Sequence, residues 1–561
     1  MMRKFILLFV HIVAFNVLSS HAQMAQKYEN SAIMNSSDYQ DGNNYQKDFL
    51  LMTELLREVH PVFSSGLPAP FNMDSLRTVG YREMRTCTSI TAFRSYLQAI
   101  LSRLNDGHTA LLPVVNESLI YPFMLYMDTD KVYLRGVNKE HEGSLGNEIL
   151  EINNQPAFKV IDSFKASISS DNEIYFYDKV GGFMQLYSVW ENNAYCLPDS
   201  MLKFKFSDGT AISLRPTSKQ EINMAFMPNN LTTNSIRKNS KSPFLYKILP
   251  EKSICYLQFN TCVDQCSLRS QYDMTKSSAG LSPESLEKRL SQIPRFDEFL
   301  ELMFQEMRNA KIQTLVVDVR NNSGGNSRLC DVLLSWITPY QQIKRYSSAI
   351  RFSKLWEVTY PLLADKYKQA FLDNHQSFEW GKLYQSSSLP SLNKGTQRDE
   401  KTKGYFRLNK DTALVFNGNL IVIQNAKTYS SAGLLVSTIV DNNLGIVIGE
   451  KSSYKPCHYG DLLYWMLPNT NVKGCISHKI FIRPDAAKCG ETTLLPTVQL
   501  ESTWKDVVSG ADVCWEWILS HYYPDTILLH RNRPEYWWKC SNPNHKPYLS
   551  AFRISRMCRE Y

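Results

Sequence analysis

The chain has 561 residues, of which 43% are hydrophobic and 21% are charged, a balance typical of globular proteins. The formal net charge of +8 comes from Lys and Arg residues scattered along the sequence, without the dense basic run of a nucleic-acid-binding surface. We therefore expect several globular domains and no nucleic-acid partner.

The N-terminus has the features of a signal peptide. Basic residues Arg3 and Lys4 precede an apolar run at 5–18, and small residues Ser20 and Ala22 fit a cut after Ala22. Residue 23 is Gln rather than the Cys of a lipoprotein anchor, and no later stretch is apolar enough to span a membrane. The sequence predicts an exported protein, periplasmic or secreted, without a membrane span.

Twelve cysteines are dispersed along the chain, and an exported location permits disulfides among them. Cys540, His545 and Cys558 lie close together in the sequence, but their spacing fits no standard metal-binding pattern. Ordinary thiols or a disulfide explain these residues, and we predict no metal site.

Two helices are expected in the first part of the chain, around 49–60 and 93–104, from their apolar periodicity. The second runs into Asn105-Asp106-Gly107-His108-Thr109, where Gly107 is suited to a helix stop. His108 is thus predicted to project from a loop just beyond a helix end. A histidine in such a loop is usually just solvated or hydrogen-bonded.

A compact β-rich module is predicted next, because 131–137, 148–152 and 202–206 alternate in the manner of strands. A short helix is expected at 158–164. The polar stretch that follows the module, at 217–250, is interpreted as a linker or an irregular insertion.

Strands and helices alternate in the next region, which predicts a layered α/β domain. Gly324 and Gly325 lie in a tight turn between a strand and a helix; taken alone, they mark a plain turn. The mostly polar stretch 340–410 resembles an inserted lobe or lid. The predicted elements are strands at 254–259, 314–319, 420–423 and 445–449 and helices at 296–307, 330–337, 432–439 and 504–519.

Ser430 is expected at the point where the 420–423 strand turns into the 432–439 helix. A hydroxyl at such a turn lies beside the free N–H groups that begin the helix, which is the arrangement that an acyl-transfer nucleophile needs. The alternative is that Ser430 or Ser431 only caps the helix, since serine is a preferred N-cap.

Four stretches, taken in order, resemble the S41 family of serine peptidases, the tail-specific or C-terminal-processing proteases. The resemblance extends over roughly 85–505, and Pro484-Asp485 resembles a step near the end of the family's core. The stretch 143–164 resembles the second half of the PDZ-like module that these proteases carry. The four stretches are Leu104–Thr109, Val317–Gly325, Thr428–Ala432 and Gly449–Lys455.

The resemblance implies that Ser430 is the nucleophile and that Lys455, 25 positions later, is its general base. A lysine can accept the serine proton only when its amine is neutral, which requires a pKa well below about 10.4. The oxyanion hole would be formed by the backbone N–H of Ser431 and that of Gly324 or Gly325. Without the resemblance, Lys455 would be a solvated surface lysine.

The sequence departs from the family pattern at Gly433, which replaces an acidic residue, and at Pro456 and Cys457, which replace a glycine-rich loop. A second branch of the family uses a His-assisted serine with supporting Ser and Glu groups, and His108 matches its histidine. His108 is therefore the alternative base. His458 is a weaker candidate, and Asp441 matches a position where the protease branch carries Asp, with at most a supporting role.

The sequence thus predicts an exported serine endopeptidase that cleaves unfolded polypeptides or C-terminal tails and needs neither metal nor organic cofactor. The predicted fold is α/β, with a crotonase-like (ClpP-like) ββα layered core. Open alternatives are an inactive peptide-binding or scaffold protein and an esterase or amidase using the same serine. The expected domains are a signal peptide (1–22), an N-terminal helical region (23–118), a PDZ-like β-rich module (119–215), a linker or insertion (216–250), a catalytic α/β domain (251–505) with an inserted lobe (340–410), and a C-terminal tail (506–561).

Overall fold

The computed structural model describes residues 32–64, 66–113, 119–191, 193–227, 236–274, 283–392 and 406–522. The chain divides into two compact units, Met1–Val513 and Cys514–Tyr561. The predicted signal peptide and the Cys540, His545 and Cys558 group lie outside the described residues. No helix in the described ranges is long and apolar enough to cross a membrane.

The N-terminal part is helical, and its helices begin at polar caps that accept free backbone N–H groups. Asn43 forms a capping box with Gln46 at the start of the longest of these helices, and Ser89 caps the helix that leads to the His108 loop. The helices are α2 (Ser37–Asp41), α3 (Asn44–Val59), α4 (Met73–Met84) and α5 (Ile90–Ser102).

The β-rich module has its own buried core, to which strands and helices both contribute. Its main sheets have the strand orders β6-β5-β7-β8 and β10-β4-β3, and β2 pairs with β9. The module's elements are β2 (Leu119–Ile120), β3 (Phe123–Asp128), β4 (Lys131–Asn138), β5 (Ile149–Ile152), β6 (Gln155–Pro156), α6 (Ala157–Asp162), α7 (Glu173–Phe183), β7 (Leu202–Phe206), β8 (Ala211–Leu214), β9 (Thr217–Ser218) and β10 (Met224–Phe226).

The α/β half of the chain, from β11 onward, is built on a six-stranded sheet of order β11-β12-β13-β16-β17-β20, parallel except for β11. β12 and β13 are buried along their whole length, which explains their continuous apolar runs. The strands are β11 (Phe244–Leu249), β12 (Ile254–Phe259), β13 (Thr314–Asp318), β16 (Asn419–Gln424), β17 (Ile446–Gly449) and β20 (Val498–Gln499).

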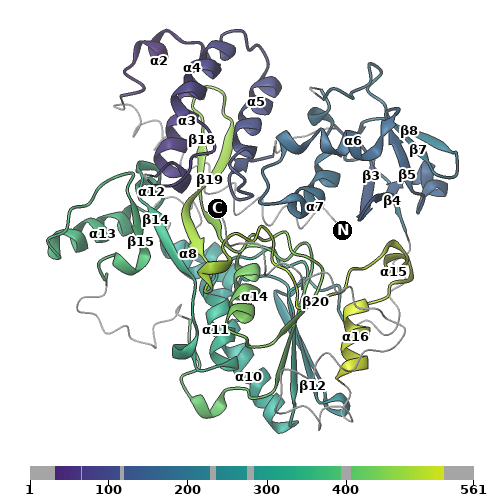
Figure 1. Cartoon of the computed structure of the whole chain (residues 1–561), viewed down its shortest axis with the longest axis vertical. Helices are drawn as coiled ribbons and strands as arrows, with labels where there is room; N and C mark the ends of the chain where they lie inside the picture. The colour runs from purple at the N-terminus through teal and green to yellow at the C-terminus, as the bar shows by residue number, and fades with distance from the viewer. Residues whose placement is uncertain are drawn as a thin grey trace, which may run out of the picture. The chain divides into compact units, whose positions relative to one another are not determined.

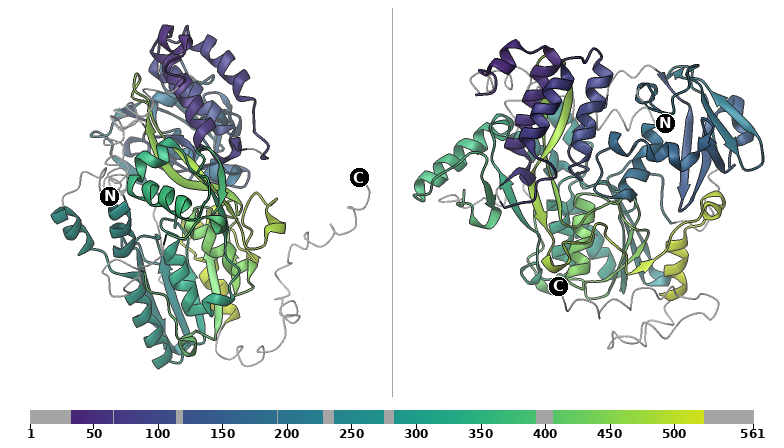
Figure 2. Two further views of the ribbon diagram at one scale, coloured as in Figure 1. Left: turned by 90° about the vertical axis from the view of Figure 1, so that its left-hand side faces the viewer. Right: turned by 45° about the horizontal axis from the view of Figure 1, so that its top comes forward.

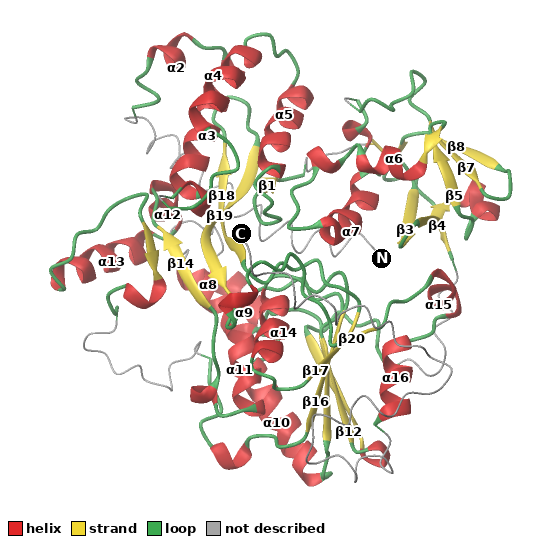
Figure 3. Ribbon diagram, viewed as in Figure 1, coloured by secondary structure: helices red, strands yellow, loops and turns green. Residues whose placement is uncertain are grey.

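Helices α10 (Phe296–Asn309), α11 (Arg328–Ile337) and α14 (Ser431–Asp441) lie along one side of this sheet (Figures 1 and 3). Their apolar faces form the largest core with β12, β13 and β16. Two smaller helices, α8 (Gln265–Met274) and α9 (Pro283–Leu290), precede α10. Because the strands are parallel, the loops at their carboxyl ends lie at one edge of the sheet, where Gly324 and Ser430 come together.

A second sheet joins the N-terminal helices to the α/β half. In it β19 pairs with β1, β14 and β18, and β15 pairs with β14. The hairpin β18-β19 lies against α3 (Figure 2) and forms a second core with the N-terminal helices. The elements are β1 (Ala110–Leu111), β14 (Ser347–Arg351), α12 (Lys354–Thr359), α13 (Pro361–Asp373), β15 (Leu383–Gln385), β18 (His458–Met466) and β19 (Lys473–Ile482).

Two predictions about local structure were wrong. The stretch 217–250 contains β10 and β11, and β11 is the edge strand of the main sheet rather than part of a linker. The predicted helix 504–519 is two helices, α15 (Trp504–Ser509) and α16 (Val513–His521). Gly510 ends α15 in the left-handed conformation, with φ of 69°.

Candidate active site

Ser430 lies between β16 and α14, at the predicted strand-to-helix turn. Its backbone has φ of 51° and ψ of −126°, which is strained for a residue with a side chain. Its hydroxyl makes no capping hydrogen bond to the helix. The strained backbone is therefore not explained by helix capping. It presents the Ser430 hydroxyl outward from the turn.

His108 reaches the Ser430 hydroxyl from the loop between α5 and β1. Its Nε2 lies 3.2 Å from Ser430 Oγ. The loop is held by the backbone N–H of His108, which donates to Asp106 Oδ1 at 2.9 Å, and by the Cys475 thiol, which donates to the His108 carbonyl at 3.4 Å. Residues 322 positions apart in the chain thus form a serine–histidine pair.

The other ring nitrogen of His108 faces Tyr429, the residue before the candidate nucleophile. The Tyr429 hydroxyl lies 3.1 Å from His108 Nδ1 and donates to Asp171 Oδ2 at 2.5 Å. The two rings are stacked with centroids 4.8 Å apart. Neither Tyr429 nor Asp171 was predicted from the sequence as a functional residue, and Asp171 lies in the irregular segment before α7 and belongs to no motif.

Asp106 is fully buried and fixes the base of the histidine loop. Its Oδ2 accepts from Thr109 Oγ1 at 2.5 Å, Ser477 Oγ at 2.7 Å and His60 Nε2 at 3.1 Å. His60 Nδ1 accepts the Val62 N–H, so the His60 proton is on Nε2. Burial opposes ionisation of Asp106, but its histidine neighbours outweigh that effect and hold its pKa well below the ordinary value.

The charges around His108 favour its protonated form. Burial alone would lower its pKa, but the carboxylates of Asp106, Asp171 and Asp461 outweigh burial, and the pKa is raised. Burial raises the pKa of Asp171 to about 6, against the opposing charge of His108. His108 therefore accepts a proton more readily than a free histidine does.

The glycine turn after β13 lies directly against the serine turn. A Cβ on Gly324 would come within 2.7 Å of Ser430 Cβ and 2.8 Å of Ser431 N, and a Cβ on Gly325 within 2.4 Å of the Cys262 carbonyl oxygen. Both glycines have positive φ, 100° and 136°. Only glycine permits this approach, so the turn is more than a plain reversal of the chain.

The backbone N–H groups of the glycine and serine turns differ in whether they already donate a hydrogen bond. The Gly324 N–H donates to Asn322 Oδ1 at 2.9 Å. The N–H groups of Gly325 and Ser431 have no hydrogen-bond partner within the described ranges. The Ser431 hydroxyl donates to the Gly325 carbonyl at 2.7 Å and ties the two turns together. Two free N–H groups beside a serine hydroxyl suit the stabilisation of an oxyanion.

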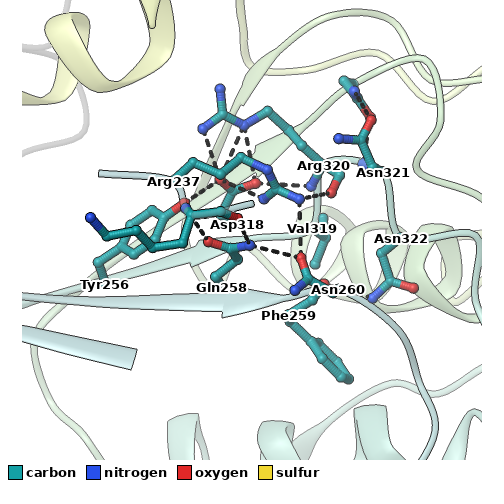
Figure 4. A network of polar contacts seen from close by, with 12 residues as sticks. Arg237, Tyr256, Gln258, Phe259, Asn260, Asp318, Val319, Arg320, Asn321 and Asn322 are labelled. Atoms are coloured by element: carbon teal, nitrogen blue, oxygen red, sulfur yellow. Dashed lines mark hydrogen bonds and ion pairs between the residues drawn. The ribbon is translucent and has the colours of Figure 1, made fainter. Parts of the chain in front are cut away.

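A buried charge network anchors the start of the glycine turn (Figure 4). Asp318, the last residue of β13, forms ion pairs with Arg320 at 2.7 Å and with Arg237 at 3.0 Å. The hydroxyl of Tyr256 donates to the same carboxylate, and Arg320 also pairs with Asp512 at 2.8 Å. Burial would raise the pKa of Asp318, but the arginine charges outweigh it and lower the pKa to about 2.

Lys455 and Asp441, the other two residues singled out by the family pattern, differ in the contacts that their side chains make. Lys455 Nζ has no hydrogen bond or ion pair with any described residue, and its charge is one of the minor causes that lower the pKa of His458. Asp441 pairs with Arg483 at 2.6 Å and accepts the Asp485 N–H at 3.0 Å. Asp441 thus holds the end of β19.

His458 is buried, and its Nδ1 lies 3.1 Å from the Tyr454 hydroxyl. Burial, followed by the charge of His108, lowers its pKa to about 3, so it stays neutral. The segment between Lys455 and β18 is further fixed by a disulfide between Cys457 and Cys489.

Gly433, where the family pattern has an acidic residue, is covered by the ring of Tyr454. A Cβ at Gly433 would lie 2.2 Å from that ring, and Tyr454 is completely buried. The space that an acidic side chain would need is therefore filled by an aromatic ring.

Asp106, His108 and Asp171 are close enough for their ligand atoms to surround one ion, within 4.8 Å of one another. Their polar atoms already have partners, however, and His108 Nε2 faces Ser430. The cluster is explained as a hydrogen-bond network.

Residues 289–458 match the model of peptidase family S41. A structure of mature CPAF complexed with lactacystin is 13% identical, with a TM-score of 0.55 over 86% of this chain and 98% of that chain. Mature CPAF alone is 14% identical, with a TM-score of 0.53 over 87% of this chain and 97% of that chain. No curated protein sequence matches the chain significantly.

The likeness to CPAF covers nearly all of that protein and shows a shared fold. The family model covers the glycine turn and the serine turn, which are the two backbone features of the site. The mixed α/β chain is therefore similar to the serine peptidases of family S41, whose model matches 289–458.

Proposed function

We propose that this protein is an exported endopeptidase in which Ser430 is the nucleophile and His108 the general base. The observation that carries the proposal is the 3.2 Å contact between His108 Nε2 and Ser430 Oγ, which is within the reach needed for proton transfer. The strained backbone of Ser430 supports the same role, since such strain is concentrated at functional sites.

In this mechanism Ser430 Oγ attacks the carbonyl carbon of the scissile peptide while its proton passes to His108 Nε2. The C–O bond that forms leaves a negative charge on the former carbonyl oxygen. The protonated histidine then gives its proton to the leaving amine as the C–N bond breaks. In the second step His108 takes a proton from water, which attacks the acyl-enzyme, and returns that proton to Ser430 Oγ as the ester bond breaks.

The oxyanion would be bound by the N–H groups of Gly325 and Ser431. Gly325 is favoured over Gly324 because the Gly324 N–H is already donated to Asn322. Gly324 instead supplies the close approach to Ser431. Such preorganised donors are worth about 10²–10³ in rate each.

Lys455 is the base in the rival proposal, taken from the Ser–Lys branch of the family. The hydrogen bond of His108 to Ser430 favours the histidine, and the lack of any ion pair or hydrogen bond of Lys455 to a described residue gives the lysine no comparable support. Asp441 is occupied by Arg483 and has no role in this proposal.

Unfolded polypeptides or C-terminal tails are the proposed substrates, and the β-rich module is the proposed PDZ-like part beside a crotonase-like core. Export is supported by the signal-peptide pattern and by the Cys457–Cys489 disulfide, since disulfides persist in oxidising compartments. The proposed location is periplasmic or secreted.

The test is labelling of the purified protein with a fluorophosphonate probe, followed by mass spectrometry. We expect the label on Ser430, and we expect Ser430→Ala to abolish both labelling and cleavage of fluorescent unfolded casein. Absence of labelling, or cleavage by Ser430→Ala, would refute the proposal. Absence of casein cleavage with Ser430 labelled would instead favour an esterase or amidase, which small-ester substrates would reveal.

A further inference from the structure

The Tyr429 and Asp171 side chains lie behind His108, on the side opposite Ser430. We propose that they are positioning residues that fix the tautomer of His108, keeping its proton on Nδ1 and leaving Nε2 free to accept the Ser430 proton. The inference rests on the proposed function, in which His108 is the base. Neither residue touches the reacting atoms.

The direction of the hydrogen bonds follows from counting protons. The Asp171 carboxylate only accepts: Oδ1 takes the Gly107 N–H at 2.8 Å and Oδ2 takes the Tyr429 hydroxyl proton at 2.5 Å. A phenol has one proton, and Tyr429 has given it to Asp171. Its oxygen can therefore only accept at His108 Nδ1, 3.1 Å away, so the histidine proton must be on Nδ1.

Asp106 does not fix the tautomer of His108. Its Oδ1 lies 3.7 Å from His108 Nδ1, too far for a hydrogen bond, and accepts the His108 backbone N–H instead. Its Oδ2 is filled by three other donors. Asp106 affects His108 through its charge and through the loop, whereas Tyr429 makes the directional contact.

The surroundings hold this arrangement firmly. Gly107 has no side chain, and a Cβ there would come within 2.6 Å of the Tyr429 hydroxyl. Asn172, next to Asp171, caps α7 and donates its amide to the carbonyls of Ser453 and Thr492. The segment that carries Asp171 is thereby tied to the α/β half.

Asp171→Asn should do more than remove a charge; it should reverse the chain of donors. The Gly107 N–H needs an acceptor, so the new amide oxygen takes that place and its NH₂ group faces Tyr429. Tyr429 then accepts from the amide and donates its own proton to His108 Nδ1. The histidine proton moves to Nε2, which points at Ser430 and can no longer accept.

The kinetic test compares Asp171→Asn, Tyr429→Phe and the double variant in cleavage of fluorescent casein. We expect Asp171→Asn to lower kcat by about 10³-fold or more with little change in KM, and Tyr429→Phe to lower it by about 10–10². The kcat of the double variant should be close to that of Tyr429→Phe and well above that of Asp171→Asn. Without the Tyr429 hydroxyl, the new amide at position 171 cannot impose the wrong tautomer on His108.

A matched control is Tyr177→Phe, which removes another tyrosine–aspartate hydrogen bond, to Asp162 at 3.0 Å, within the β-rich module. Its kcat should stay within about twofold of the unmodified enzyme. Thermal unfolding of every variant shows whether a loss is one of folding.

The direct readout is ¹⁵N-histidine NMR, with His108 assigned by the signal missing in His108→Ala. We expect protonated Nδ1 and bare Nε2 in the unmodified enzyme, and the reverse in Asp171→Asn. The inference would be overturned if the kcat losses of the two single variants multiplied in the double variant, or if the tautomer were unchanged in Asp171→Asn. Either result would leave Ser430 and His108 in their roles. Full activity of His108→Ala would instead remove the proposed function itself.

Discussion

Ser431 Oγ donates to the carbonyl of Gly325 at 2.7 Å and thereby joins the turn that carries the candidate nucleophile to the turn that carries a candidate oxyanion donor. The two residues are 106 positions apart, and the bond fixes the spacing of the two free N–H groups. This contact gives the second serine of the pair a function different from that of Ser430.

We expect Ser431→Ala to lower kcat about tenfold with little change in KM. The loss is smaller than the 10²–10³ of losing an oxyanion donor, because both N–H groups remain and only their spacing is loosened. Ser102→Ala, which removes a serine bond to a carbonyl on α5, serves as control. A Ser431→Ala enzyme as inactive as Ser430→Ala would mean that the nucleophile had been placed one residue too early.

Substitution of the two candidate bases separates the rival mechanisms. We expect His108→Ala to lower kcat by about 10⁴-fold or more, because Ser430 loses its proton acceptor. Lys455→Arg keeps the positive charge but cannot lose its proton, so its activity should stay near normal if His108 is the base. An inactive Lys455→Arg together with a working His108→Ala would establish the lysine dyad. Steady-state kinetics on casein provides the measurement.

The pH dependence should show the raised pKa of His108. Protonated His108 cannot accept the serine proton, so kcat/KM should fall as pH decreases through a pKa above the ordinary 6.5. Asp461→Asn removes one distant negative charge and should move this acid limb to lower pH, whereas Asp461→Glu should leave it in place. An acid limb that does not move between the two variants would exclude His108 as the titrating group. The charged or titratable groups facing His108 are Asp106, Asp171, Tyr429, His458, Asp461 and Cys475.

Gly433→Ala should destabilise the fold by about 1–3 kcal/mol, because the new methyl group would overlap the buried Tyr454 ring. Gly182→Ala in α7 is the matched control: nothing lies within 4 Å of its added Cβ, and alanine favours a helix. Urea unfolding of the two variants measures the difference. Equal stability would mean that Tyr454 moves aside without cost.

Periodicity in the sequence predicted the elements around the site well. The strand before Ser430 and the helix after it were confirmed as β16 and α14, and His108 lies in the expected loop after α5. These features depend on near neighbours in the chain, which a local pattern records. The helix predicted across Gly510 failed because the apolar pattern continues past a residue whose backbone turns left-handed.

The partners of His108 could not be predicted in the same way. Asp171 is a single acidic residue in an irregular segment, and its partner Tyr429 is 258 positions away. No spacing or repeat connects them, since the contact exists only where the β-rich module packs against the α/β half. Lys455 was suggested by a spacing drawn from relatives, and spacing alone does not say which side chain reaches the serine.

The segment matched by the family model, 289–458, holds Ser430 and both glycines but neither His108 nor Asp171. A recombinant fragment with only this segment would therefore retain the proposed nucleophile and lack the proposed base. Activity would have to be restored by supplying the polypeptide on both sides of this segment in trans, because β11, β12, β19 and β20 also lie outside it. For engineering, the histidine loop and the segment before α7 must be transplanted together with the sheet.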